Sequence, residues 1–260
     1  MFFRKIQRKF LAVLIIAVAF PAIALIVTYL NEPKIIKEPL PLSQPYKRKT
    51  VTTSPVPRIS ATISPSTPAS SLPPEINLAV PFTSQSPYQN WELPYSEFCE
   101  EASTLIAASY INRMTINDPA YANKKLLEVK SFEEARFGYY QDTNAEETAI
   151  ILREFFKIDK VSIVYDPKIE DIKKALAGGR VVIIPAAGRL LHNPYFQQPG
   201  PLYHMLVIKG YTKTGNFITN DPGTRHGADY IYAPDIIMNA IHDWNGGDVT
   251  NGRKVMIVVG

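Results

Sequence analysis

One thiol is available to this chain of 260 residues, because Cys99 is its only cysteine. A single cysteine excludes a disulfide framework within the chain and leaves packing, metal binding or reactivity. Cys99 lies in "YSEFCEEASTLIAASYI", residues 95–111, whose apolar residues recur at helical spacing. It therefore stands at a helix amino terminus, where the partial positive charge favours a thiolate, although Glu100 and Glu101 oppose it. These residues leave two interpretations open, a reactive nucleophile and a buried structural thiol.

A cysteine nucleophile needs a base, and His204 is the histidine best placed to be one. It begins "HMLVIKGY", a predicted strand with an apolar interior, so its ring can reach a cleft. Asp221 follows seventeen residues later in "ITNDPGT", at the end of the next predicted strand. If the two strands pair as a hairpin through "TKTGN", both residues lie at one edge of the sheet and the acid can orient the imidazole. The alternative for Asp221 is an ordinary turn, which "NDPG" also predicts.

Three separate blocks, "AVPFTSQSPYQNWELPYSEFCEEAS", "GPLYHMLVIKGY" and "FITNDPGTRHG", resemble the papain-like cysteine peptidases of the bacteriocin-leader-processing type. The resemblance is to the stand-alone, C39-like branch of that family and runs through most of residues 78–258. It implies a cysteine that opens a helix packed on an antiparallel sheet, which presents the histidine. It also implies Cys99 as nucleophile, His204 as base and Asp221 as the residue that orients the base. Gln85, fourteen residues before Cys99, matches the glutamine whose amide contributes to the family's oxyanion hole.

Two departures from the family leave the substrate open. Leader-processing enzymes commonly have Asp-Cys-Gly where this chain has Phe98-Cys99-Glu100. The chain also contains no GxxxxGK[ST] loop, the phosphate-binding motif of an ATP-driven transporter. Cleavage after a double glycine is therefore not predicted.

Candidate substrate-recognition residues lie close to these blocks. The long loop 185–201 precedes the strand of His204 and contains Arg189, Asn193 and Tyr195. Trp91 lies near the loop that carries Cys99. The alternative is a solvated loop for the first three and a packing role for Trp91.

No metal or organic cofactor is predicted. Metal-binding residue types recur near the carboxyl end of the chain, at His226, Asp229, His242 and Asp243. Their spacing fits no zinc pattern, and hydrolysis of an amide by a thiol nucleophile requires no cofactor. A serine nucleophile is not indicated either, since the chain has no GxSxG motif.

The segments between these residues predict an α+β domain over residues 76–260. Helices are predicted over 99–111, 121–130, 144–156, 169–179 and 234–244. Strands are predicted over 160–165, 180–186, 203–211, 215–220 and 254–259, and a short strand that ends in a loop over 77–85. Asn144 and Glu147 have the spacing of a capping box at the start of the third helix. Because helices come mostly first and strands mostly last, we expect a largely antiparallel sheet. The family resemblance implies that the cysteine-bearing helix packs on this sheet.

The amino-terminal part of the chain differs from this domain. Residues 1–9 form a basic tail, and residues 10–30 are 21 consecutive residues without a charge, enough to cross a hydrocarbon core of about 30 Å. The excess of cations before this segment predicts a single-pass anchor in the cell membrane with a cytoplasmic amino terminus. A cleaved signal peptide is the alternative, because "AIA" at 22–24 resembles a cleavage site. Residues 31–75, with ten prolines and twelve serines or threonines, predict a disordered linker.

The charge distribution argues against nucleic acid as a partner. The net charge of +4 comes from the tail and linker, whereas residues 76–260 hold 18 Lys/Arg and 21 Asp/Glu, a net of −3. A phosphate backbone requires a basic stripe that this domain lacks. The sequence therefore predicts a membrane-anchored, extracytoplasmic cysteine peptidase that hydrolyses amide bonds of a peptide or protein. The alternatives are a peptidoglycan amidase or peptidase acting on a cell-wall peptide, and a tethered binding module without catalysis.

Overall fold

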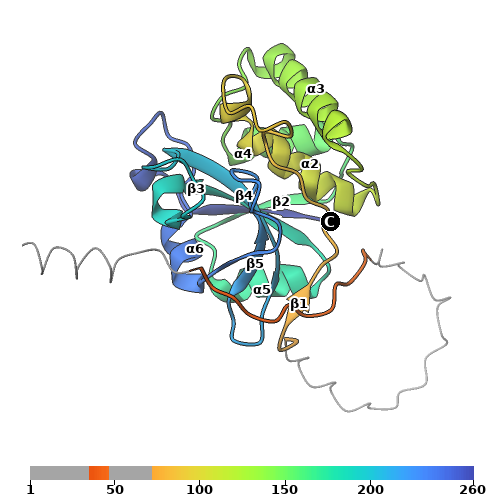
Figure 1. Ribbon diagram of the computed structural model, residues 1–260, viewed down its shortest axis with the longest axis vertical. Coiled ribbons are helices and arrows are strands. Elements are labelled where there is room, and N and C mark those ends of the chain that lie inside the picture. The colour runs from red at the N-terminus through yellow and green to blue at the C-terminus, as the bar shows by residue number, and fades with distance from the viewer. Residues whose placement is uncertain (1–34, 47–71) are drawn as a thin grey trace, which may run out of the picture. The chain divides into compact units, whose positions relative to one another are not determined.

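The computed structural model describes residues 35–46 and 72–260, which include most of one compact unit, Ile36–Gly260 (Figure 1). Its strands are β1 Ile76–Asn77, β2 Val161–Tyr165, β3 Val181–Ala187, β4 Tyr203–Tyr211, β5 Phe217–Asn220, β6 Tyr230–Tyr232 and β7 Val255–Val259. Its α-helices are α2 Cys99–Ile111, α3 Pro119–Phe137, α4 Ala145–Ile150, α5 Ile169–Ala177 and α6 Pro234–Ala240. The predicted α+β class is confirmed.

The described strands form one antiparallel sheet. Their order is β2-β7-β3-β4-β5-β6, and β1 pairs separately with β4. The predicted hairpin of β4 and β5 is present, with Val207 opposite Asn220 and Tyr211 opposite Phe217. β6 is an addition to the prediction, because three residues are too few to show an alternating pattern.

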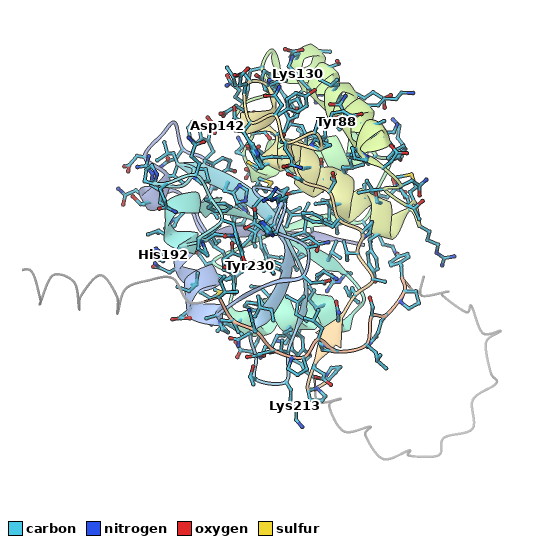
Figure 2. All side chains as sticks on the ribbon, viewed as in Figure 1. Tyr88, Lys130, Asp142, His192, Lys213 and Tyr230 are labelled. Carbon is cyan, nitrogen blue, oxygen red and sulfur yellow. The ribbon has the colours of Figure 1, made fainter. Side chains whose placement is uncertain are left out.

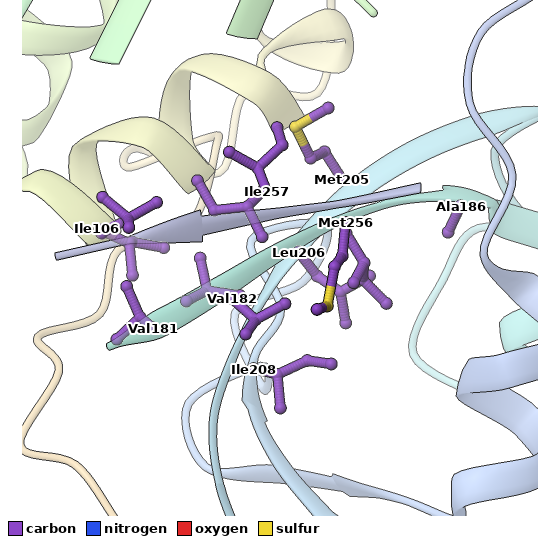
Figure 3. Packing of buried hydrophobic residues seen from close by; sticks show 14 of the residues in the cluster. Ile106, Val181, Val182, Ala186, Met205, Leu206, Ile208, Met256 and Ile257 are labelled. Atoms are coloured by element: carbon purple, nitrogen blue, oxygen red, sulfur yellow. The ribbon is translucent and has the colours of Figure 1, made fainter. Parts of the chain in front are cut away.

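The central strands are buried from end to end, which explains their continuous apolar sequences. Every residue of β3, β4 and β7 is buried. Helices cover both faces of the sheet, with α2, α3 and α4 on one side and α5 and α6 on the other (Figure 1). Figure 3 shows Ile106 of α2 gathered with Val181 and Ile257 where helix and sheet meet. Such two-sided cover is what buries strands without alternation.

The helix that carries Cys99 has the predicted bounds, and the next two differ at their ends. α3 starts earlier than predicted, where Asp118 accepts a hydrogen bond from the Tyr121 N–H at 2.8 Å. It runs on to Phe137 and ends at Gly138 in the left-handed conformation. The capping box of Asn144 and Glu147 is confirmed at the start of α4. The remainder of that predicted helix, Ile151–Phe155, is a π-helical segment, η2.

α6 is shorter than the helix predicted over 234–244. It ends at Ala240, because Ile241 forms a bridge with Ala186 of β3. The N–H of His242 likewise donates to the Pro185 carbonyl at 3.2 Å. Pairing with the sheet thus replaces the last helical turn, an effect that the local apolar spacing does not reveal.

Part of the predicted linker packs on the domain. The N–H of Gln44 donates to Asn77 O and its carbonyl accepts from the Ala79 N–H, both at 2.8 Å. Glu38 accepts hydrogen bonds from Thr214 at 2.7 Å and from Asn216 at 2.6 Å. Residues 36–46 are thus extended but held in place, which differs from the expected absence of fixed structure. We call this segment the strap.

The predicted basic tail and membrane anchor, residues 1–30, lie outside the described residues. Among the helices of residues 35–46 and 72–260, none is both long and apolar enough to cross a bilayer. The anchor therefore stays a prediction from the sequence.

Candidate active site

Cys99 is the first residue of α2, and α2 is fixed against the sheet. The Ser103 hydroxyl donates to the Met205 carbonyl of β4 at 3.0 Å. Leu105 and Ile106 are completely buried against the core. Because Met205 directly follows His204, this contact brings the amino-terminal end of α2 to the start of β4.

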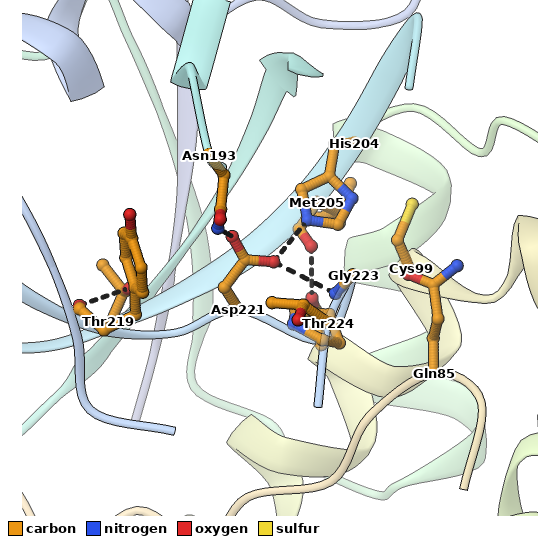
Figure 4. A network of polar contacts seen from close by, with 12 residues as sticks. Gln85, Cys99, Asn193, His204, Met205, Thr219, Asp221, Gly223 and Thr224 are labelled. Atoms are coloured by element: carbon orange, nitrogen blue, oxygen red, sulfur yellow. Dashed lines mark hydrogen bonds and ion pairs between the residues drawn. The ribbon is translucent and has the colours of Figure 1, made fainter. Parts of the chain in front are cut away.

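His204 and Asp221 meet at one edge of the sheet, as expected from the hairpin. His204 lies near the start of β4, and Asp221 directly follows β5. The Nε2–H of His204 donates to Asp221 Oδ1 at 2.8 Å, and both side chains are buried. The other ring nitrogen of His204 points toward the Cys99 sulfur (Figure 4). A neutral imidazole that donates through one nitrogen accepts through the other, so the nitrogen facing Cys99 can take a proton.

Asp221 is held as a carboxylate by four hydrogen bonds. Besides His204, the Gly223 N–H donates to Oδ1 at 3.0 Å. Tyr232 OH donates to Oδ2 at 2.6 Å, and Asn193 Nδ2 does so at 3.2 Å. Burial alone would raise the pKa of Asp221, but the charge of His204 and these hydrogen bonds outweigh it and hold that pKa below its ordinary value. The acid is therefore ionised and can accept from the imidazole at neutral pH.

Cys99 is a buried free thiol whose hydrogen bond runs to a carboxyl group. Its Sγ donates to Glu100 Oε2 at 3.0 Å. Among the described residues, no hydrogen bond joins this sulfur to the ring of His204, whose Nε2 is bonded to Asp221. Burial first, and next the charge that Glu100 carries when it is ionised, raise the pKa of Cys99 well above its ordinary value. The thiol therefore keeps its proton until a base removes it.

A cavity of about 370 Å³ opens over these groups. Cys99, His204, Gln85 and Trp91 line it together with the loop that contains Pro199. That volume accommodates a few side chains of a peptide rather than a large ligand. The cavity brings a thiol, a base and polar groups to one accessible space, the arrangement required for nucleophilic attack on a carbonyl.

The sequence matches the Peptidase_C39 like family over residues 77–246. The chain belongs to the Peptidase_C39 like family. The predicted resemblance is thereby confirmed, and the protein is a cysteine-type peptidase by family. A comparison with the curated proteins gives no match.

The solved structures that are similar to this C39-like peptidase include two other peptidases. One is a C39-like peptidase from Bacillus anthracis, 14% identical, which covers 70% of this chain and 95% of its own at a TM-score of 0.39. The other is a fragment of prointerpain A from Prevotella intermedia, 16% identical, which covers 53% of this chain. The matched region is 42% of that fragment, and the TM-score is 0.35.

Gln85 of the C39-like chain lies beside Cys99, with its amide already engaged (Figure 4). Its Nε2 donates to the carbonyls of Tyr95 and Ser96, both at 3.0 Å. Its Oε1 is buried and has no hydrogen-bond partner among the described residues. Both amide hydrogens therefore fix the loop that leads to Cys99. An oxyanion-hole role, which stays a prediction, requires one of these bonds to be exchanged for the substrate oxygen.

The predicted recognition residues divide into one that lines the cavity and three that do not. Trp91 lines it and is partly exposed. Asn193 is buried, with 2% of its surface exposed. Its side-chain amide donates hydrogen bonds to Asp221 and Tyr232. Arg189 does not line the cavity but donates to the carbonyl of Gly200, which does, at 3.4 Å. Tyr195 stacks on His226, with ring centroids 4.4 Å apart.

Three residues of the site were not predicted from the sequence. Tyr232 and Glu100 contact Asp221 and Cys99 as described above. A Cβ on Gly223 would lie 2.7 Å from His204 Cε1, so only glycine leaves room for the ring. Of these three, only Glu100 could have been found from the sequence, because it directly follows the candidate nucleophile on a helix predicted to pack on the sheet. Tyr232 and Gly223 had no such signal, because their contacts depend on β6 and on the turn after β5.

Proposed function

We propose that this protein is a papain-like, membrane-anchored, extracytoplasmic cysteine peptidase that hydrolyses amide bonds through Cys99, His204 and Asp221. The observation that carries the proposal is the His204 ring, bonded to Asp221 on one side and facing Cys99 on the other. A thiol hydrolase requires a nucleophile, a base beside it and an acid that orients the base, and these three residues are arranged in that order. Peptides or proteins are the proposed substrates.

The reaction begins with transfer of the Cys99 proton to His204. The resulting thiolate attacks the carbonyl carbon of the scissile amide, and the carbonyl oxygen becomes an oxyanion. The N–H of Cys99 has no partner within its helix, as in the first turn of any helix, and donates to that oxygen. Gln85 becomes a second donor when one of its loop bonds is released. His204 then gives its proton to the leaving amine, and a thioester acyl-enzyme remains.

Water completes the cycle. His204, again neutral, removes a proton from a water molecule, whose oxygen attacks the thioester carbon. The carbon–sulfur bond breaks, the acid product leaves, and Cys99 recovers its proton. Asp221 stabilises the imidazolium in both halves of the reaction, because it stays ionised within its four hydrogen bonds.

The membrane location rests on the sequence of residues 1–30. A charge-free segment of 21 residues behind four cations supports a single-pass anchor with the domain outside the cytoplasm. Of the predicted linker that follows, residues 36–46 pack on the domain as the strap. Fractionation of cells that express the full chain, followed by protease treatment of intact cells, tests this location: cleavage of the domain from outside supports it.

Labelling with an electrophilic peptide probe tests the catalytic proposal. Wild-type protein should react covalently, Cys99→Ser should not, and His204→Ala should react at least about 100-fold more slowly. An Asp235→Asn variant, altered at an exposed position on α6, serves as the control and should match wild type. Equal labelling of wild type and His204→Ala would contradict the proposal and favour a binding module. Turnover of purified wall fragments, but not of peptides, would redirect it to a peptidoglycan substrate.

A further inference from the structure

Glu100 is an acid in an environment that does not support its charge. Only 1% of its surface is exposed, and its Oε1 has no hydrogen-bond partner in the described part of the chain. Its Oε2 lies 3.0 Å from the Cys99 sulfur. A buried carboxylate without a cation is costly, so the neutral carboxylic acid is favoured.

The titratable groups around Glu100 are acidic and come from several elements. They are Cys99 and Glu101 of α2, Glu97 of the 3₁₀ helix η1 (Tyr95–Glu97), Glu133 of α3, Asp142 before α4, and Tyr203 of β4. Asp142 lies on the helical side of the domain (Figure 2). No lysine or arginine of residues 35–46 and 72–260 forms an ion pair with any of these acids. Burial, the largest cause, raises the pKa of Glu100 to about 8.

We propose that Glu100 works as a neutral acid that donates its carboxyl O–H to the Cys99 thiolate. This role rests on the proposed function, because it concerns the state in which His204 has taken the thiol proton. In the resting site the thiol donates to Oε2. After proton transfer to His204, the sulfur becomes the acceptor, and the Oε2–H of the neutral carboxyl turns toward it and donates across the same 3.0 Å contact. No proton leaves Glu100 in this exchange.

Two consequences follow for the nucleophile. A hydrogen bond to an anionic acceptor is about twice as strong as a neutral one, so it favours the thiolate and fixes the direction of the sulfur. An ionised Glu100 would do the opposite, because a carboxylate beside the sulfur repels a second negative charge. Glu100 is thus a positioning residue whose effect on Cys99 reverses when it loses its proton. It compensates for the burial that disfavours the thiolate.

The test measures how fast iodoacetamide alkylates Cys99 in the full chain between pH 5 and 10. Glu100→Gln retains a donor without a charge and should stay within about threefold of wild type at neutral pH. Glu100→Leu removes the donor and should react about tenfold more slowly at pH 7, by the loss of one charge-assisted hydrogen bond. The rate of wild type relative to Glu100→Gln should be constant below about pH 8 and fall above it, as Glu100 ionises. Glu128→Gln, at a partly exposed side chain of α3 that pairs with Lys125, is the control.

Two outcomes would overturn this role. One is a Glu100→Leu protein that folds and reacts like wild type at pH 7; the other is a wild-type to Glu100→Gln ratio that stays flat through pH 8. The second comparison decides the matter even if Glu100→Leu does not fold. Alkylation of His204→Ala separates this inference from the proposed function. An unchanged rate in His204→Ala overturns the catalytic proposal, whereas a lowered rate together with unresponsive Glu100 variants overturns only the role of Glu100.

Discussion

The Nε2–H of His204 donates to Asp221 Oδ1 at 2.8 Å between two buried side chains. This contact joins a strand start to the end of the next strand in the hairpin, and it leaves the other ring nitrogen facing Cys99 (Figure 4). The position of the ring is therefore determined by the acid behind it.

Replacement of Asp221 by asparagine should keep an oxygen acceptor but remove the negative charge that holds the ring and stabilises the imidazolium. We expect the peptidase activity to fall by roughly 10²- to 10⁴-fold, as when the acid of a triad loses its charge. Steady-state cleavage of a peptide substrate measures it, with Asp235→Asn as control. Activity within twofold of wild type would show that Asp221 only closes a turn.

Tyr232→Phe tests the support of the acid. The variant loses the 2.6 Å donor to Asp221 and the hydroxyl that accepts from Asn193 at 2.8 Å. We expect a loss of about 1–3 kcal/mol in the free energy of unfolding, together with a lower kcat. The neighbouring Tyr230→Phe is a matched control, because no hydrogen bond of that hydroxyl is present among the described residues. Equal effects of the two variants would contradict the role given to Tyr232.

Gly223→Ala should displace the His204 ring. The added methyl group would lie 2.7 Å from His204 Cε1 and 2.9 Å from Phe196 Cε1, closer than carbon atoms pack. Since the ring must move, we expect kcat to fall at least about tenfold. Circular dichroism should show an unchanged fold, and unchanged kinetics would mean that the turn shifts instead of the ring.

The stability of the domain should fall as the pH rises from about 5 to 9. Burial, and next the charge of Glu100, raise the pKa of Glu133 to about 9, and burial raises that of Glu101 well above its ordinary value. Between the unfolded and folded pKa the folded state binds more protons, so the free energy of unfolding decreases with pH. We expect a decrease on the order of a few kcal/mol, measured by urea unfolding at pH 5.5, 7 and 8.5.

Glu133→Gln should flatten this dependence, because it removes the proton whose loss destabilises the fold. Its neighbour Glu134→Gln is the control: that side chain is partly exposed and pairs with Lys130. A surface pair contributes little, so its slope should match wild type. A steep dependence that survives Glu133→Gln would assign the effect to the other buried acids, Glu100 and Glu101.

Tyr46→Ala should loosen the strap. The Tyr46 ring meets Tyr110 edge-on, with centroids 5.2 Å apart, and Arg113 lies over it at 5.9 Å. Without these contacts, the amide of Ala79, which donates to Gln44 O, should exchange with solvent more than about tenfold faster. Leu42→Ala, at a side chain that is 91% exposed, should leave hydrogen exchange unchanged. Protection that persists in Tyr46→Ala would mean that the backbone bonds alone hold the strap.

Features that depend on neighbouring residues were predictable from the sequence. The bounds of α2 follow from apolar spacing, the start of α4 from its capping box, and the β4–β5 hairpin from two strand-like runs around a glycine turn. Because His204 and Asp221 sit at the ends of those two strands, their meeting was predictable too. The family resemblance, carried by short motifs around Cys99 and His204, was likewise confirmed.

Features that depend on distant residues appeared only in the folded chain. Asn193, predicted to bind substrate, serves Asp221 instead, 28 positions away. Gln44 of the strap forms a bridge with Leu78, directly after β1, and α6 ends early because Ile241 pairs with Ala186. A sequence therefore determined the chemistry that this protein can carry, since residue types and short-range periodicity are local. Which side chains are buried together, and hence which acids keep their protons, was decided by tertiary packing, since desolvation depends on every element that surrounds a group.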